Sequence, residues 1–502
     1  MQKRLLFSTL LMILVVWAHP ALSQSPSPRV RTIVTTDGEV DDQDSFIRLL
    51  LYANEFSIEG LIYSSSQWHY KGDGKGTMFT SEMKNTKERY GSLAALRWPG
   101  TTWIQEFIDK YASVYPTLLQ HDKKYPSPES LKQVTRVGNI DFEGAMFADT
   151  EGSDFIKQKL LDSTTAPIYL QIWGGTNTVA RALKSIEEEY NTKNNWSAIR
   201  EKVSRKAILY MVLDQDATYQ KYISVAWPAI RVMYNSDQFW CLAYPWTRFV
   251  PAELQRTLRG PWFSENIKFN HGPLLASYYL WGDGTAIEND PEHTHGDIRE
   301  AKKFGLGQYD FISEGDSPAF FYLVDVGLRN MEDASYGGWG GRMVQAAANP
   351  NRWEDGKHVT DYNPFTKKLD AAYPQTRWIT ALQNDFAARA DWCVNGYEKA
   401  NHAPVVKLVG ANNIAASVGT RVKLKSTVKD PDGDNLHYKW WQYEEVDSYA
   451  GKIQLTGMNQ AAASFKVPKD AKKGDTIHVI LEVSDSGTPS LTRYQRVVVS
   501  VR

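Results

Sequence analysis

The sequence contains few cysteines, almost no net charge and no long apolar run beyond its first residues. Cys241 and Cys393 are too few for a disulfide-stapled scaffold or a cysteine-based metal site, although one bridge and two free buried thiols both fit the count. Lys and Arg number 57 against 58 Asp and Glu, so no overall charge attracts the chain to nucleic acid or to an anionic membrane. We therefore expect neither partner.

The first 23 residues have the order of a secretory signal. Basic residues precede the apolar run from Leu5 to Ala18, and small residues lead up to Ser23, where we expect cleavage. This run is shorter than the ~20 residues that cross a bilayer, and no later stretch approaches that length. We predict a secreted or periplasmic protein that does not insert into a membrane once residues 1–23 are removed.

Aromatic residues, in contrast, are abundant, with 17 Trp and 26 Tyr. Most such rings fill protein cores, but flat amphipathic rings also bind sugars, so their number is a weak indication of a carbohydrate ligand. The hydrophobic fraction of 42% supports packed cores, and at ~150 residues per domain the 502 residues suggest about three structural units.

The apolar pattern predicts an α/β domain followed by a β-sandwich. Strands are expected at residues 30–36, 58–65, 167–173 and 207–213, with helices after Asp42 and at 177–190, and this alternation favours a doubly wound, mostly parallel sheet. We assign this domain to residues 29–348 and a helical connector to 349–401, with its helix at 373–397. Residues 402–502 contain short alternating strands that are typical of an immunoglobulin-like sandwich.

Five carboxylates follow the first predicted strand within eight residues. They are Asp37, Glu39, Asp41, Asp42 and Asp44, and they lie where the crevice of a doubly wound sheet opens. Such a cluster can cap the next helix through its free N–H groups. It can equally hold a hard cation such as calcium or magnesium, because crowded carboxylates resist ionisation unless a cation compensates them. The residues alone leave both interpretations open.

The segment from Val34 to Asp42 resembles the Asp-x-Asp-Pro-Gly-x-Asp-Asp signature of the nucleoside hydrolases. The whole mature chain is similar to a secreted bacterial group with a nucleoside-hydrolase-like domain and a carboxyl-terminal immunoglobulin-like domain, sometimes labelled cellulose-binding. This resemblance implies a calcium cofactor and hydrolysis at the anomeric carbon of a sugar.

The resemblance also implies roles for individual residues. Asp37 matches the aspartate that binds calcium and takes the proton from the attacking water. Further metal ligands are Asp42, the Thr176 carbonyl in Gly174-Gly175-Thr176-Asn177, and Asp316 in Glu314-Gly315-Asp316-Ser317-Pro318. The implied substrate-binding residues are Asp41, Gln67, Asp214 and Asp216.

The chain departs from the signature where the leaving group is handled. Gly315 replaces the histidine that assists departure of the base, so a purine or pyrimidine has no obvious acid to protonate it, and another aglycone becomes credible. His69 and Glu314 are candidate acids. Trp339 has two glycines on each side. It could stack on a sugar ring, or it could be a buried residue of a tight turn. Trp440 and Trp441 must point to opposite faces of a strand, one to the core and the other to a sugar or to the first domain.

These observations predict a secreted, calcium-dependent hydrolase of N-glycosyl or O-glycosyl bonds, with a small molecule or an oligosaccharide as substrate. Water held near Asp37 would attack the anomeric carbon, and Asp41, Asp214 and Asp216 would stabilise the positive charge that develops there. The alternative is a non-catalytic carbohydrate-binding protein that retains the nucleoside-hydrolase fold, with aromatic residues supplying the affinity.

Overall fold

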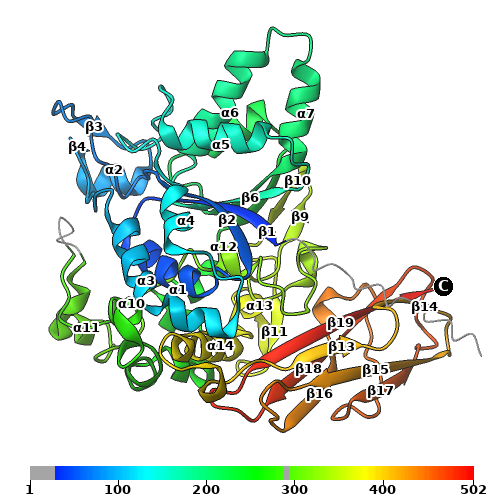
Figure 1. The fold of residues 1–502 in the computed structure, drawn as a ribbon. Coiled ribbons are helices and arrows are strands. Elements are labelled where there is room, and N and C mark those ends of the chain that lie inside the picture. Colours follow the sequence, from blue (N-terminus) through cyan, green and yellow to red (C-terminus); the bar gives the residue numbers. More distant parts are fainter. Residues whose placement is uncertain (1–28, 288–292) are drawn as a thin grey trace, which may run out of the picture.

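The computed structural model describes residues 29–287 and 293–502. The predicted signal at 1–23 lies outside these residues. Figure 1 shows a layered α/β domain and, beside it, an elongated β-sandwich formed by the end of the chain. Within the described ranges, no helix is long and apolar enough to cross a membrane. Cys241 and Cys393 are both buried free thiols, so they form no bridge.

The first domain is built on a sheet of eight strands in which seven run parallel. Only β9 is antiparallel to its neighbour. Its strands are, in spatial order, β5 (Thr135–Val137), β2 (Phe56–Tyr63), β1 (Val30–Thr36), β6 (Ile168–Trp173), β7 (Ala207–Val212), β8 (Arg231–Asn235), β10 (Asn349–Glu354) and β9 (Val344–Ala346).

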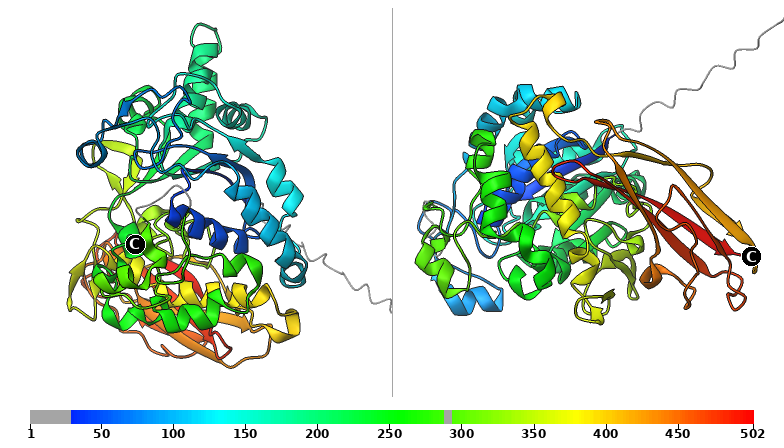
Figure 2. Two further views of the ribbon diagram at one scale, coloured as in Figure 1. Left: turned by 90° about the vertical axis from the view of Figure 1, so that its left-hand side faces the viewer. Right: turned by 90° about the horizontal axis from the view of Figure 1, so that it is seen from below.

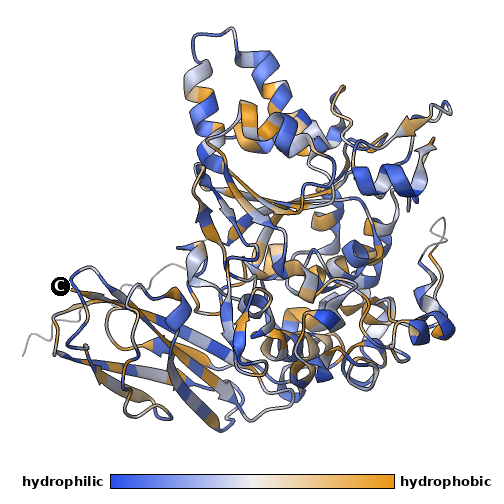
Figure 3. Cartoon of the chain, turned by 180° about the vertical axis from the view of Figure 1, so that it is seen from behind, coloured by the Kyte–Doolittle hydropathy of each residue, from blue (hydrophilic) through white to orange (hydrophobic). Residues whose placement is uncertain are grey.

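Helices cover both faces of this sheet because successive strand residues point to opposite sides (Figure 1). On β1, Ile33 packs with α5 (Glu151–Leu161), α6 (Asn177–Tyr190) and α7 (Trp196–Lys206), whereas Val34 belongs to the core on the other face. That second core is covered by α1 (Val40–Leu51), α3 (Trp103–His121), α10 (Gly272–Ala276), α12 (Pro318–Phe321) and α14 (Ile379–Trp392). Colouring by hydropathy shows apolar residues concentrated along the strands (Figure 3). The predicted doubly wound α/β class is confirmed.

The structure differs from the predicted connector at 349–401 in two places. The first residues of this segment form β10, which pairs with β8 and so belongs to the sheet of the first domain. The predicted helix at 373–397 is two helices, α13 (Tyr373–Thr376) and α14, because the N–H of Trp378 donates to the Gln375 carbonyl in a tight turn between them. α14 ends at Trp392. Apolar periodicity continues through such a turn, so the pattern alone did not locate it.

The remaining elements are short. They are α2 (Lys84–Tyr90), α4 (Pro128–Gln133), α8 (Ser224–Ala226), α9 (Gly260–Phe263), α11 (Ile298–Lys303), and the pairs β3 (Phe79–Thr80) with β4 (Ser92–Leu93) and β11 (Asp361–Asn363) with β12 (Lys368–Asp370).

The carboxyl-terminal domain is the predicted sandwich. One sheet orders β13 (Val405–Leu408), β15 (Arg421–Lys429) and β17 (Ala462–Lys466), and the other β14 (Asn413–Ala416), β19 (Thr492–Val501), β18 (Thr476–Asp485) and β16 (Leu436–Gln442). Trp440 is 1% exposed in the sandwich core, whereas Trp441 packs against the core of the first domain. The first domain's core also includes Tyr443, Ile480 and Tyr494, so apolar packing runs across the interface.

A buried histidine at this interface gives a prediction for pH. Nη1 of Arg496 lies 3.2 Å from Nδ1 of His478, and burial together with the charges of Arg496 and Arg329 lowers the pKa of His478 to about 3. Because an unfolded histidine titrates near pH 6.5, the stability that depends on neutral His478 is complete above pH 6.5 and is lost as the pH falls towards 3. We expect a loss of about 2 kcal/mol between pH 6.5 and 5.

Urea unfolding at pH 7 and pH 5 measures this loss. His478→Gln should remove that part of the pH dependence, whereas His437→Gln, at an exposed position on the same sheet, should leave it unchanged. Identical pH dependence in the wild type and His478→Gln would contradict the assignment.

Candidate functional site

Three residues connect β1 to α1 and direct the carboxylates to the end of the sheet. The Asp37 N–H donates to the Trp173 carbonyl of the neighbouring β6 at 3.2 Å, so the end of β1 is held in register. Gly38 then turns the chain with φ of +81°, and a Cβ on it would lie 2.6 Å from Cγ of Pro99. Glycine is therefore required for a turn this tight.

Asp41, Asp42 and Asp316 form a compact group of carboxylates from α1 and from the loop before α12. One oxygen of each lies within 4.8 Å of the others. Ser313 donates to Asp41 at 3.2 Å and Thr36 donates to Asp42. Burial, followed by the charges of neighbouring carboxylates, raises the pKa of all three aspartates well above the ordinary value. Such a group is stable only if it holds protons or a cation.

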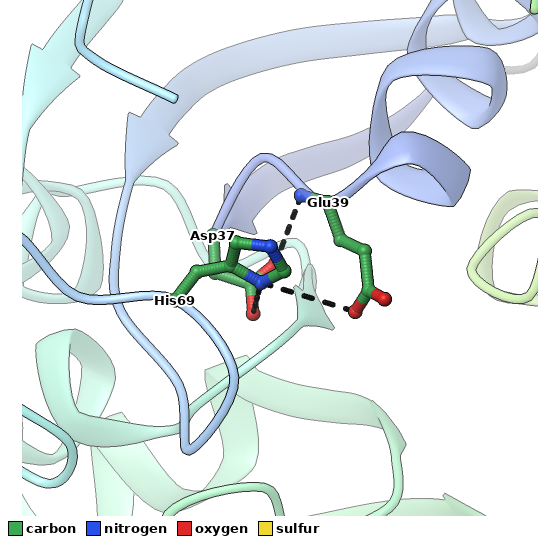
Figure 4. A group of neighbouring side chains, drawn as sticks. All are labelled: Asp37, Glu39 and His69. Atoms are coloured by element: carbon green, nitrogen blue, oxygen red, sulfur yellow. Dashed lines mark hydrogen bonds and ion pairs between the residues drawn. The ribbon is translucent and has the colours of Figure 1, made fainter. Parts of the chain in front are cut away.

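Asp37, Glu39 and His69, which Figure 4 shows, form a second group. Nδ1 of His69 lies 3.6 Å from Oδ2 of Asp37 and 3.9 Å from Oε2 of Glu39. Burial would raise the pKa of Asp37, but the hydrogen bond and the charge of His69 bring it below the ordinary value. Asp37 is therefore the member of the cluster that is best suited to remain ionised and to accept a proton.

Glu39, Asp41, Asp42 and Asp316 line one side of a cleft of about 580 Å³, and Asp37 lies next to them without lining it. Tyr244 on the opposite wall donates to Glu39 at 3.0 Å, and its hydroxyl lies 3.1 Å from Nε2 of His293. Many of the other residues that line the cleft are aromatic or basic. They include Trp68, Arg89, Arg97, Phe239, Trp240, Arg248, Trp281, His295 and Phe304.

Two family models match this chain. Residues 31–343 match the model described as cellulose-binding Sde182, nucleoside hydrolase-like domain, and residues 421–501 match that of the cellulose-binding protein Sde0182, C-terminal domain. The chain belongs to the Sde182 family. The predicted resemblance is confirmed, and the acidic turn after β1 lies in the nucleoside hydrolase-like domain of this family.

One solved structure supports the fold of this Sde182-family chain. A nucleoside hydrolase-related protein from Saccharophagus degradans, described as associated with carbohydrate metabolism, is 24% identical, with 94% of this chain and 100% of that chain covered and a TM-score of 0.68. The effector protein XOO4466 is 10% identical over 74% of this chain and 95% of its own, with a TM-score of 0.37. No curated protein matches the chain.

Four residues predicted for the site lie behind the cleft of this Sde182-family domain. Asp216 accepts hydrogen bonds from Thr176 and from the Asn177 N–H at 2.9 Å, and thus caps α6. The Thr176 carbonyl accepts from the Ala180 N–H at 2.9 Å, which leaves one lone pair available. Burial and then the charge of Asp216 raise the pKa of Asp214 to about 6. Gln67 accepts from Thr86 at 2.7 Å.

Glu314 and Trp339 are buried away from the cleft. Glu314 is 0% exposed and accepts from Arg48 at 2.9 Å, from Ser317 at 2.7 Å and from Tyr278. Every oxygen of this carboxylate is thus used within the core. Trp339 is 1% exposed, which agrees with the tight-turn alternative rather than with stacking on a ligand. Neither residue lines the cleft.

Gly315 approaches the carboxylates too closely to have a side chain. A Cβ there would lie 2.8 Å from Oδ2 of Asp41 and 3.4 Å from Cβ of Ala243. The space that the histidine of the nucleoside hydrolase signature would need is thus occupied in this Sde182-family chain. The packing around residue 315 therefore requires glycine, and glycine in place of histidine removes an acid from this wall of the cleft.

Several cleft residues were not predicted from the sequence. Tyr244, Trp240 and Arg248 lie between β8 and α9, with Trp240 and Arg248 in short 3-10 helices, and Trp281 and His293 lie in the loops after α10. These segments have no regular apolar period, so pattern analysis could not place them at the crevice. The sequence contains one indication of their place, the concentration of aromatic residues in Phe239-Trp240 and Tyr244-Pro245-Trp246.

The donors present fit a hard cation. Oδ1 of Asp316 is buried and accepts no hydrogen bond among the described residues, and Oδ2 of Asp37 is buried with Nδ1 of His69 3.6 Å away. Buried carboxylate oxygens without partners are costly unless a charge compensates them. Except for the ring nitrogen of His69, the donors of the two groups are carboxylate oxygens, the kind of ligand that calcium and magnesium prefer. The acidic groups could therefore hold a metal ion.

Proposed function

We propose that this chain is an exported hydrolase that cleaves a glycosidic bond, N-glycosyl or O-glycosyl, of a sugar bound in the cleft. The observation that carries the proposal is the cluster of buried carboxylates at one end of a cleft with aromatic walls. Nucleoside-hydrolase-like ancestry supports the same reaction class. Export through residues 1–23 is consistent with a polysaccharide-associated family.

Calcium is the cofactor that we propose for this site, held by Asp37, Asp42, Asp316 and the Thr176 carbonyl. A bound calcium ion would orient sugar hydroxyls and acidify a water molecule. The lowered pKa of Asp37 keeps this carboxylate ionised at neutral pH, so it is free to take the proton of a water molecule that the ion has acidified. Asp41 faces the cleft, where its carboxylate can bind sugar hydroxyls and stabilise positive charge at the anomeric carbon. Direct attack by water predicts inversion at that carbon.

The walls of the cleft favour a sugar as the bound group. Trp240 and Trp281 offer flat apolar surface, and Tyr244 and His293 offer hydrogen-bonding groups near Glu39. A few polar groups among aromatic rings are typical of a site that orients a polyhydroxyl ligand. Because Gly315 supplies no acid on its wall, an aglycone other than a purine or pyrimidine base is a credible leaving group.

A second candidate function is carbohydrate binding without catalysis. The family description as cellulose-binding favours it, and the same carboxylates and rings would serve as a sugar-binding surface. The two functions differ in what a chelator does. Hydrolysis through metal-activated water requires the ion, whereas stacking on aromatic rings does not.

A substrate panel with chelator separates these functions. Purified protein is incubated with nucleosides, aryl glycosides and cello-oligosaccharides, with calcium or with EDTA, and reducing ends and released aglycones are quantified. We expect one substrate class to turn over with calcium, turnover to stop in EDTA, and calorimetry to give one calcium per chain. Retention of a glycan in EDTA without turnover of any substrate would overturn the hydrolase and support the binding protein.

A further inference from the structure

A groove of about 580 Å³ lies between the two domains, apart from the cleft. Helices α13 and α14 form one wall of the groove. Strand β11 and Pro364, which follows it, form another. The floor is the face of the β16–β18–β19 sheet that is turned away from the sandwich core. Figure 1 shows these elements together where the sandwich meets the first domain.

Strand register explains why this face of the sheet is polar in its outer part. Lys439 pairs with Glu482, which pairs with Tyr494, while Ser484 pairs with Thr492. Their side chains share one face, because residues opposite one another in an antiparallel pair point the same way. In the next row towards the first domain, Ile480 and Arg496 are fully buried, so the outer rows are left to line the groove.

Aromatic rings form the other side of the groove. Tyr362 on β11 is 50% exposed, while Trp441 and Trp378 lie deeper with ring centroids 6.3 Å apart. The guanidinium of Arg377 lies 4.8 Å from the ring centroid of Trp441 and donates to Asp361 at 2.9 Å. These contacts fix the deep rings and leave the ring of Tyr362 available to a ligand.

The charges of the groove are balanced locally. Lys439 lies 3.9 Å from Glu482, and Glu444 lies 3.1 Å from Lys452 at the edge. Arg377 is paired with Asp361. An anionic ligand such as a nucleotide or a polyuronate would meet Glu444 and Glu482 with no excess of positive charge, and an apolar peptide would meet hydroxyl groups and carboxylates along the floor. A neutral polyhydroxyl ligand matches both the rings and the paired charges.

We propose that this interdomain groove is a second carbohydrate site, which binds a neutral oligosaccharide chain with Tyr362 as its stacking platform. Glu482 and the hydroxyl groups of Ser484 and Thr492 would hydrogen-bond to the sugar hydroxyls. The groove then anchors the protein on a glycan independently of the cleft. Its binding function does not depend on hydrolysis, because it shares no residue with the carboxylate cluster.

Affinity electrophoresis through gels that contain hydroxyethyl cellulose, with calorimetry on cellohexaose, tests this site in the full chain. Wild type and Asp37→Ala should both be retarded. Tyr362→Ala should weaken binding by roughly 3- to 10-fold, the loss of one ring contact. Glu482→Gln keeps the shape of the side chain and should weaken binding by a smaller factor, because a charged acceptor is lost.

Phe365→Ala is the matched control, since Phe365 is 40% exposed on the same hairpin but does not line the groove. It should bind like the wild type, and thermal melts should show every variant to be folded. Equal binding by Tyr362→Ala and Phe365→Ala would overturn the site, as would preferential binding of a polyuronate or a peptide. Loss of turnover in Asp37→Ala with binding retained separates failure of the groove from failure of the cleft.

Discussion

Replacement of Asp37 by asparagine should lower the turnover number for the glycosidic substrate by roughly 10²- to 10⁴-fold, the usual contribution of a general base. Asparagine keeps a carbonyl oxygen that can face a cation, so calcium affinity should fall much less than turnover. The side chain can no longer take a proton from water. Steady-state kinetics at saturating calcium, with calcium binding measured separately by calorimetry, distinguish these two effects.

Asp44→Asn is the control for this variant. Asp44 lies on α1, the helix that follows Asp37, and is fully buried, but it accepts from the Tyr279 N–H at 2.8 Å and belongs to neither carboxylate group of the site. Burial raises the pKa of Asp44 well above the ordinary value, so an uncharged amide should replace it at little cost. Comparable losses of turnover in Asp37→Asn and Asp44→Asn would show that Asp37 has no special role in the reaction.

The part of the site at the junction of β1 and α1 could be predicted from the sequence. Asp37 and Asp42 follow a buried strand, and in a parallel sheet the carboxyl ends of strands meet at one edge, so a crevice was expected there. Asp316 could be placed with them only through the family resemblance. His69 was a candidate from its loop alone, and its closeness to Asp37 became evident only in three dimensions.

The residues that could not be predicted correctly are those whose partners come from distant segments. Glu314 reads as part of an acidic element beside Asp316, yet Arg48 and Tyr278 hold it in the core. Similarly, β10 reads as the start of a connector, although β8 pairs with it. Local pattern determines which face of an element is apolar, but not which partner that face meets.

The pairing of Arg48 with Glu314 leads to the largest expected effect on stability. Both side chains are 0% exposed, and their shortest N–O distance is 2.9 Å. Arg48 also donates to Gln383 of α14 at 2.6 Å and to the Leu382 carbonyl at 3.1 Å, so it joins α1, α14 and the loop that leads to Asp316. Arg48→Met should lower the free energy of unfolding by about 3–5 kcal/mol, because Glu314 is left as an uncompensated buried charge.

A double variant isolates the cause of this loss. Arg48→Met with Glu314→Gln removes both charges, so urea unfolding should show a large part of the stability restored relative to Arg48→Met alone. Arg205→Met breaks the pair with Glu201, whose side chains are 75% and 64% exposed, and should leave the unfolding midpoint unchanged. If the double variant were no more stable than Arg48→Met, the loss would come from packing around Phe321 and Phe386 rather than from the unpaired carboxylate. A restored midpoint together with restored calcium affinity would instead show that this ion pair positions the loop bearing Asp316.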